Sequence, residues 1–233
     1  MKQTPKRTRN KTDLARQPAG GKLAEYLLEK GIAGLGPLSS AEDLAREYLD
    51  DASYDSNDAR VDALVLRETT KNFATGFVTG LGGFITLPVA VPSALVASWV
   101  LQARLAAAIA RIHGHDLASP HTRTSILLSL AGDVAREAMG DLGVPFSSGN
   151  GLTRRAVEQV PGRALVEINK RIGLKLLARA GERTIANFSR FVPLLGGVVG
   201  GTMDAVVCRM VARTAQDLLA PADGEIIDGD IVQ

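Results

Sequence analysis

Three histidines and an aspartate are the only group of residues in this sequence that resembles a set of metal ligands. His113, His115, Asp116 and His121 lie close together in the segment HGHDLASPH. Imidazole and carboxylate groups can bind Zn²⁺, but the sequence has neither the HExxH nor the CxxC spacing of known sites. Because such a polar segment is typical of a solvated loop, we expect no metal here, and the histidines are weak candidates only.

Two aspartates, Asp133 and Asp204, are candidates for buried polar groups. Asp133 lies among leucines in a predicted helix, and Asp204 lies at the edge of an apolar stripe. A buried carboxylate is destabilising unless it is paired, so we expect an ion pair or a helix cap at each, with Arg209, Arg104 or another base as the partner of Asp204. The alternative is a soluble helical enzyme that uses these carboxylates or the histidines in a polar cavity.

The sequence lacks the common signatures of catalysis. The glycine-rich stretches GLGG (80–83) and LLGGVVGG (194–201) follow no predicted strand and precede no Lys-Ser or Lys-Thr, so they are not phosphate-binding loops. No GxSxG motif occurs. The single cysteine, Cys208, excludes an intrachain disulfide and indicates a reducing compartment. We therefore assign no catalytic residue and expect no cofactor.

The apolar pattern predicts helices throughout and no sheet. Apolar residues make up 45% of the chain and aromatic residues only 4%, a mixture that favours close packing of helices. Ser39 and Glu42 have the spacing of a capping box, which predicts a helix running toward Asp50. Further helices are predicted over residues 23–29, from 57 onward, over 120–139, over 153–180 with a break at Pro161, and over 190–218. The predicted fold is an all-α multi-helix bundle with a central apolar, glycine-rich helical hairpin.

The predicted hairpin lies in an uncharged segment. Residues 72–103 carry no formal charge, and Pro88 and Pro92 divide the segment into arms over 72–87 and 93–112. Within the uncharged residues 72–103, each arm is shorter than the roughly 20 apolar residues that cross a bilayer, unless it borrows flanking residues. We favour shallow or re-entrant insertion; the alternatives are a full span and the buried centre of a soluble bundle. The candidates for membrane contact are Phe73, Phe77, Phe84, Leu87, Trp99, Phe191, Leu194 and Leu195.

Glycines recur at four-residue spacing in both apolar regions. Such GxxxG pairs let two helix backbones approach closely, whereas each glycine in a helix otherwise costs about 0.5–1 kcal/mol relative to alanine. This spacing indicates close helix packing, in a membrane or inside a soluble bundle. The pairs are Gly76 with Gly80, Gly196 with Gly200, and Gly197 with Gly201.

Charge is strongly segregated along the chain. Residues 1–22 hold seven bases and one acid and predict a disordered basic tail, residues 23–220 predict a single helical domain, and residues 221–233 predict a disordered acidic tail. Residues 151–190 hold nine bases and three acids, and part of this stretch is amphipathic, which is either a grip on anionic lipids or an ordinary solvated face. The headgroup candidates are Arg154, Arg155, Arg163, Lys170, Arg171 and Lys175.

The chain resembles the EcsC protein family of bacteria. The resemblance is densest in KNFATGFVTGLGGFITLPVAVPSALVASWVLQARLAAAIARIHGHDL (71–117) and in INKRIGLKLLARAGERTIANFSRFVPLLGGVVGGTMDAVVCRMVARTA (168–215). Its specific motifs are LPVAVP and PLLGGVVGGTMDA, and with the helices between them it covers residues 40–219. The resemblance implies a helical, membrane-associated protein and carries over no catalytic residue. His113 and His115 differ from the aromatic or glycine residues common in the family at this loop.

These observations lead to one expected function and two alternatives. We expect a membrane-associated protein without catalytic activity, on the cytoplasmic side of a bacterial inner membrane. No apolar segment follows the basic N-terminus, so we expect no secretory signal. Lipids are the expected partner, with a protein partner or a second copy also open; nucleic acid is not expected, since the basic tail has no aromatic residue to stack on bases. The alternatives are the helical enzyme and a helical interaction or membrane-inserting module.

Overall fold

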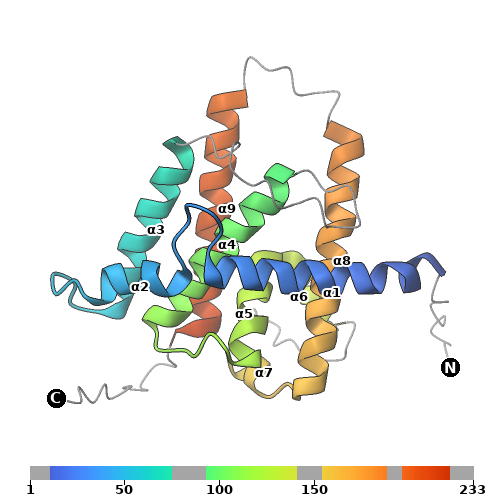
Figure 1. Ribbon diagram of the computed structural model, residues 1–233, viewed down its shortest axis with the longest axis horizontal. Helices are drawn as coiled ribbons and strands as arrows, with labels where there is room; N and C mark the ends of the chain where they lie inside the picture. The colour runs from blue at the N-terminus through green and yellow to red at the C-terminus, as the bar shows by residue number, and fades with distance from the viewer. Residues whose placement is uncertain (1–10, 75–92, 141–153, 188–195, 221–233) are drawn as a thin grey trace, which may run out of the picture.

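All of the regular secondary structure in the described part of the chain is α-helix. In the computed structural model, residues 11–74, 93–140, 154–187 and 196–220 are described; they form nine α-helices and no strand (Figure 1). This confirms the predicted all-α class. The helices are α1 (Lys11–Ala33), α2 (Ala41–Leu49), α3 (Asn57–Ala74), α4 (Ser93–Ile112), α5 (Pro120–Ala131), α6 (Asp133–Gly140), α7 (Arg154–Glu158), α8 (Gly162–Asn187) and α9 (Gly196–Leu219).

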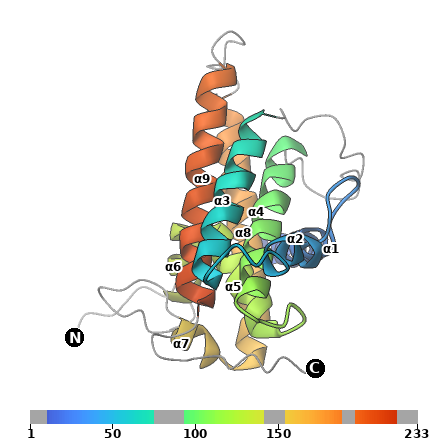
Figure 2. The same cartoon turned by 90° about the vertical axis from the view of Figure 1, so that its left-hand side faces the viewer.

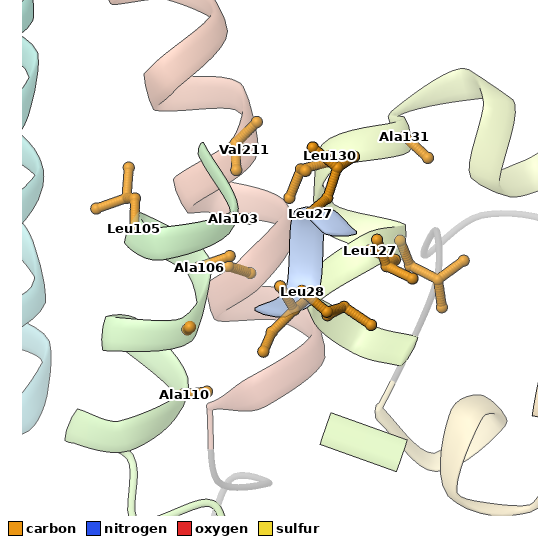
Figure 3. Packing of buried hydrophobic residues seen from close by; sticks show 14 of the residues in the cluster. Leu27, Leu28, Ala103, Leu105, Ala106, Ala110, Leu127, Leu130, Ala131 and Val211 are labelled. Atoms are coloured by element: carbon orange, nitrogen blue, oxygen red, sulfur yellow. The ribbon is translucent and has the colours of Figure 1, made fainter. Parts of the chain in front are cut away.

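Helix α4 is the centre of the bundle and packs against α1, α2, α3, α5 and α9. Its alanines leave room for neighbouring side chains, so Leu27 and Leu28 of α1 lie between Ala106 of α4 and Leu127 of α5 (Figure 3). Among the described residues, the stretch Leu95–Ile112 is the one helix long and apolar enough to cross a bilayer, and 78% of it is buried inside the bundle. The second arm of the predicted hairpin is therefore a core helix.

Helix α1 begins earlier than the sequence predicts. It starts at Lys11, so the prediction of a disordered tail over residues 1–22 is wrong for residues 11–22, and residues 1–10 lie outside the described part. Pro18, Gly20 and Gly21 are residue types that often interrupt a helix. Instead, Gly20 brings the backbone of α1 against the backbone of α8, where a Cβ atom at Gly20 would lie 2.7 Å from the carbonyl oxygen of Lys170.

Two helix boundaries differ from the prediction for local reasons. Ser40, one residue later than predicted, caps α2: its hydroxyl oxygen accepts a hydrogen bond from the backbone N–H of Asp43 at 3.0 Å. The helix predicted over 120–139 is divided at Gly132, whose φ of +52° lies in the left-handed region that favours glycine. Asp133 is consequently the first residue of α6, whereas the sequence predicts it in the middle of a helix.

A buried ion pair joins three parts of the bundle. Arg104 of α4 contacts Glu68 of α3 at 3.2 Å, with both side chains 8% exposed. The same guanidinium donates to the carbonyl oxygen of Ser39 at 2.9 Å and to the hydroxyl of Ser39 at 3.0 Å. Because these groups occupy Arg104, the prediction that it pairs with Asp204 is not supported.

Four long helices have an end on the same side of the molecule, at the top of Figures 1 and 2. These ends are Ala74 of α3, Ser93 of α4, Asn187 of α8 and Gly196 of α9. Helix α7 and the start of α8 lie at the opposite side. Residues 75–92 connect α3 to α4, and residues 188–195 connect α8 to α9. The two connecting segments carry one formal charge, that of Arg190. We call this side of the molecule the apolar pole.

Candidate functional site

A cavity of about 360 Å³ lies between α4, α5, α8 and α9. This volume falls within the range of roughly 300–1,000 Å³ that is usual for small-molecule sites. Its floor is buried, with Trp99 8% exposed and Val211 and Ala180 more deeply covered. The described lining residues are Leu95, Ser98, Trp99, Gln102, Ser129, Leu130, Ala131, Gly132, Leu176, Arg179, Ala180, Val207, Met210, Val211 and Thr214.

The polar side chains in the cavity wall are hydrogen-bonded to the protein itself. The amide nitrogen of Gln102 donates to the hydroxyl of Ser98 at 3.1 Å. The hydroxyl of Ser129 donates to the carbonyl oxygen of Ser125 at 2.8 Å, and that of Thr214 donates to the carbonyl oxygen of Met210 at 3.0 Å. These bonds use part of the hydrogen-bonding capacity of the wall, and most of the other lining residues are apolar.

One charged residue, Arg179 of α8, lines the described part of this cavity. Its side chain is exposed, as are Gly132 and Met210, so these three residues form the rim. Arg179 makes no ion pair with any described residue, and no acid is among the described lining residues. The cavity is thus an apolar pocket with a cation at its opening.

Helix α9 presents an exposed apolar and basic face next to this opening. Val206 is 55% and Met210 59% exposed, and Arg209 and Arg213 are exposed on the same side of the helix. The apolar stripe predicted along this helix therefore divides: Val211 and Leu218 are buried, whereas Val206 and Met210 face outward. Large exposed apolar side chains flanked by arginines are typical of a face that meets a membrane or a partner.

A second, smaller cavity of about 230 Å³ contains two of the three histidines. The Nε2 atom of His115 lies 2.6 Å from the carbonyl oxygen of Leu219, and that of His121 lies 3.1 Å from the carbonyl oxygen of Val160. A carbonyl oxygen can only accept, so each Nε2 carries the hydrogen. Both rings hold chain segments together through this atom. Arg154 and Glu158, which form an i,i+4 ion pair, also line this cavity.

His113 lies apart from this cavity, in the core. It is 2% exposed, and neither ring nitrogen has a hydrogen-bond partner in the part of the chain that the structure describes. Burial lowers the pKa of His113; nearby Asp58 acts in the opposite direction and His115 in the same direction. No group of three histidine, cysteine, aspartate or glutamate side chains among the described residues is arranged to hold a metal ion.

The predicted headgroup candidates are spread along α7 and α8. Arg155, Arg163 and Lys170 are exposed, and Lys175 is half-buried. Arg171 pairs with Glu167 at 3.4 Å, as Arg154 does with Glu158. Arg154, Arg155 and Arg163 lie on or beside α7, at the side opposite the apolar pole. They therefore lie away from the ends of α3, α4, α8 and α9 at the apolar pole.

The predicted membrane contacts have different outcomes. Trp99 is buried in the cavity wall, so the prediction that it meets lipid disagrees with its place in the bundle. Six of these contacts lie outside the described residues, as do two of the close-packing glycines: Phe77, Phe84, Leu87, Phe191, Leu194, Leu195, Gly76 and Gly80. The remaining candidates lie in helices α3 and α9, where the structure describes the backbone but not the side chains: Phe73, Gly196, Gly197, Gly200 and Gly201. The same holds for Asp204 of α9.

The sequence gives no local signal for most residues of the larger cavity, whereas it does give one for the close helix crossing. Arg179 is one of these residues: nothing in the sequence around it indicates that α4, α5 and α9 lie close to this part of α8. Gly20 and Gly173 were also missed, although glycine within a long helical pattern is a signal for close backbone approach. Cys208 is a buried, free thiol on α9.

Comparison with known proteins adds no relative. No family model, no curated protein and no solved structure matches this chain.

Proposed function

We propose that this chain is a membrane-associated helical protein, of the type that the EcsC resemblance implies, which contacts a bilayer with its apolar pole and has no catalytic activity. One observation carries the proposal: the ends of α3, α4, α8 and α9 at that pole flank the two most apolar connecting segments of the chain. Segments attached at the same side can enter one lipid leaflet together. The proposed place of action is the cytoplasmic face of a bacterial inner membrane.

The energetics favour contact at the pole over contact along α7 and α8. Burying a phenylalanine or leucine side chain contributes about 1.5–3 kcal/mol, and residues 75–92 and 188–195 contain several of each. A lysine or arginine near an anionic surface contributes about 1 kcal/mol. The exposed Val206 and Met210, with Arg209 and Arg213 beside them, would extend the contact along α9.

A competing interpretation is that both apolar segments complete the core of a soluble bundle. The buried position of α4 favours this interpretation for the second arm of the hairpin. The two interpretations differ in what they predict for residues 75–92. In a soluble bundle, a charge introduced there would unfold the protein, whereas at a lipid-facing pole it would weaken membrane binding and leave the fold intact.

Co-sedimentation with vesicles tests the proposal. We would compare the wild-type chain with the double variant Phe77→Asp/Phe84→Asp, and with Val166→Asp as the matched control. Val166 is 54% exposed but lies near the start of α8, away from the apolar pole. The vesicles would contain phosphatidylcholine with and without phosphatidylglycerol, and circular dichroism would monitor folding.

The double variant should lose membrane affinity by tenfold or more, because each phenylalanine contributes about 1.5–3 kcal/mol when buried. The control should bind like the wild type. Wild-type protein that stays in the supernatant with every vesicle composition would refute the proposal. So would a double variant that binds vesicles normally, or one that loses its cooperative helical fold.

A second function is favoured by one observation, the presence of His115 and His121 in the same cavity as Arg154 and Glu158. This is the convergence of polar groups that a helical hydrolytic enzyme would need. If these histidines are catalytic, His121→Gln should abolish the hydrolytic activity and leave the free energy of unfolding unchanged. If they hold chain segments together, the same variant should lower the free energy of unfolding by about 1 kcal/mol, the usual contribution of one hydrogen bond.

A further inference from the structure

We propose that the cavity between α4, α5, α8 and α9 binds one fatty acid of about a dozen carbons, with the chain inside and the carboxylate at Arg179. The proposal deepens the proposed function, since a bilayer is the natural source of such a molecule. It is nevertheless tested in solution without vesicles, so the two proposals can fail separately.

The size and walls of the cavity suit a single alkyl chain. Protein interiors are close-packed and contain few voids larger than a water molecule, so a space of about 360 Å³ with a buried floor is unusual. A cavity of about 150 Å³ in another protein holds one benzene molecule. By proportion, this cavity has room for about a dozen carbon atoms. A two-chain phospholipid is too large.

The chemistry of the walls favours an alkyl chain over a mainly polar ligand. Gln102, Ser129 and Thr214 each donate to a group of the protein. The remaining lining consists largely of leucine, valine, alanine and the indole of Trp99. A sugar or nucleoside would find few free donors or acceptors here and would lose its hydrogen bonds to water. An alkyl chain has none to lose.

The charge at the rim selects the head of the ligand. Arg179 is the one charged residue among the described lining residues, and it has no acid beside it there. A guanidinium binds a carboxylate with two parallel hydrogen bonds, whereas it repels an ammonium headgroup. The exposed Met210 lies on the same rim, and its flexible thioether can move to admit a chain.

Binding can be measured by tryptophan fluorescence, because Trp99 is the single tryptophan of the chain and lines the cavity. Bromine quenches indole fluorescence only at close range, so 12-bromododecanoate bound inside should quench Trp99. The titration would use the full chain, with ligand concentrations below micelle formation. Dodecanol and dodecyltrimethylammonium would be the neutral and cationic competitors.

Arg179→Ala is the informative variant, because its exposed side chain can be removed without disturbing the core. Loss of a charge-assisted hydrogen bond should weaken dodecanoate binding by about tenfold or more and leave dodecanol binding unchanged. Arg163→Ala is the matched control, an exposed arginine near the other end of the same helix. It should bind dodecanoate like the wild type.

Three results would overturn the inference. The first is folded wild-type protein whose Trp99 fluorescence is not quenched by 12-bromododecanoate. The second is an equal loss of binding in Arg179→Ala and Arg163→Ala, which would indicate general attraction to positive charge. The third is tighter binding of the cationic than of the anionic amphiphile. Quenching that persists in a protein unable to bind vesicles would uphold this inference and reject only membrane association.

Discussion

The crossing of α1 and α8 leaves no room for a methyl group at Gly20. A Cβ atom there would lie 2.7 Å from the backbone nitrogen of Leu174 and 2.7 Å from the carbonyl oxygen of Lys170. At Gly173, an added Cβ would overlap with the carbonyl oxygen of Gly20. These are backbone atoms, which cannot rotate away as a side chain can. Gly20→Ala must therefore push the two helices apart.

The size of the effect follows from two opposing terms. Alanine in place of glycine inside a helix ordinarily stabilises it by about 0.8–1.0 kcal/mol, whereas overpacking a close contact typically costs about 1–3 kcal/mol. Separation of the helices would also expose part of Leu23 and Leu27, which are fully buried on α1. We expect Gly20→Ala to lower the free energy of unfolding by about 2 kcal/mol, because the lost contacts add to the overpacking.

Gly21 provides a control on the same helix. A Cβ atom there would meet only the Cγ atom of the Lys170 side chain, at 3.4 Å, so Gly21→Ala should stabilise the protein by up to about 1 kcal/mol. Urea unfolding followed by circular dichroism would measure both variants, with equal m-values as the condition for comparing them. If both alanines stabilise the protein to the same extent, α1 does not cross α8 at Gly20.

Three further predictions concern buried or strained groups. Glu68→Gln should cost about 3–5 kcal/mol, because it leaves Arg104 charged and unpaired in the core, whereas Glu47→Gln, which breaks an exposed ion pair with Arg67, should cost under about 1 kcal/mol; urea midpoints that shift equally would contradict this. Burial lowers the pKa of His113 in the folded protein, so as the pH falls the imidazole is protonated in the unfolded chain before it is protonated in the folded one. The free energy of unfolding should therefore be constant above pH ~6.5 and should decrease as the pH drops from there toward the pKa of the folded state. His113→Leu should flatten that decline between pH 7.5 and 5.5, and an unchanged slope would show that other groups cause it. Gly132→Ala should cost about 1–2 kcal/mol in a thermal or urea melt, since its φ of +52° strains any side chain; a neutral result would place the α5–α6 break elsewhere.

The features that the sequence predicted well are those with a local cause. Helix α4 begins at Ser93, one residue after Pro92, and ends at Ile112, before the polar loop, as predicted. The start of α3 at Asn57 and the break before α8 at Pro161 agree as well. Proline and the boundaries of the apolar pattern act within a few residues, so a single sequence is sufficient to find them.

The features that the sequence did not predict depend on contacts between distant segments. Whether Gly20 breaks a helix or lets another helix approach depends on what lies opposite it, and the answer is Gly173. Likewise, the cavity requires α4, α5, α8 and α9 to meet, and Arg179 is one exposed base among many until they do. The burial of Trp99 was missed for the same reason: an apolar helix in a bundle centre has the composition of one in lipid.

The pairing of α1 with α8 sets an order of events during synthesis. The start of α8 at Gly162 lies 129 residues after the end of α1 at Ala33. At ribosomal rates of about 5–20 residues per second, α1 therefore waits roughly 6–26 s for this neighbour to be made. Helix α4, its other main neighbour, is made sooner and can shield part of α1 in the meantime. During synthesis, the surface of α1 around Gly20 therefore stays uncovered until α8 has been translated and can pack against it.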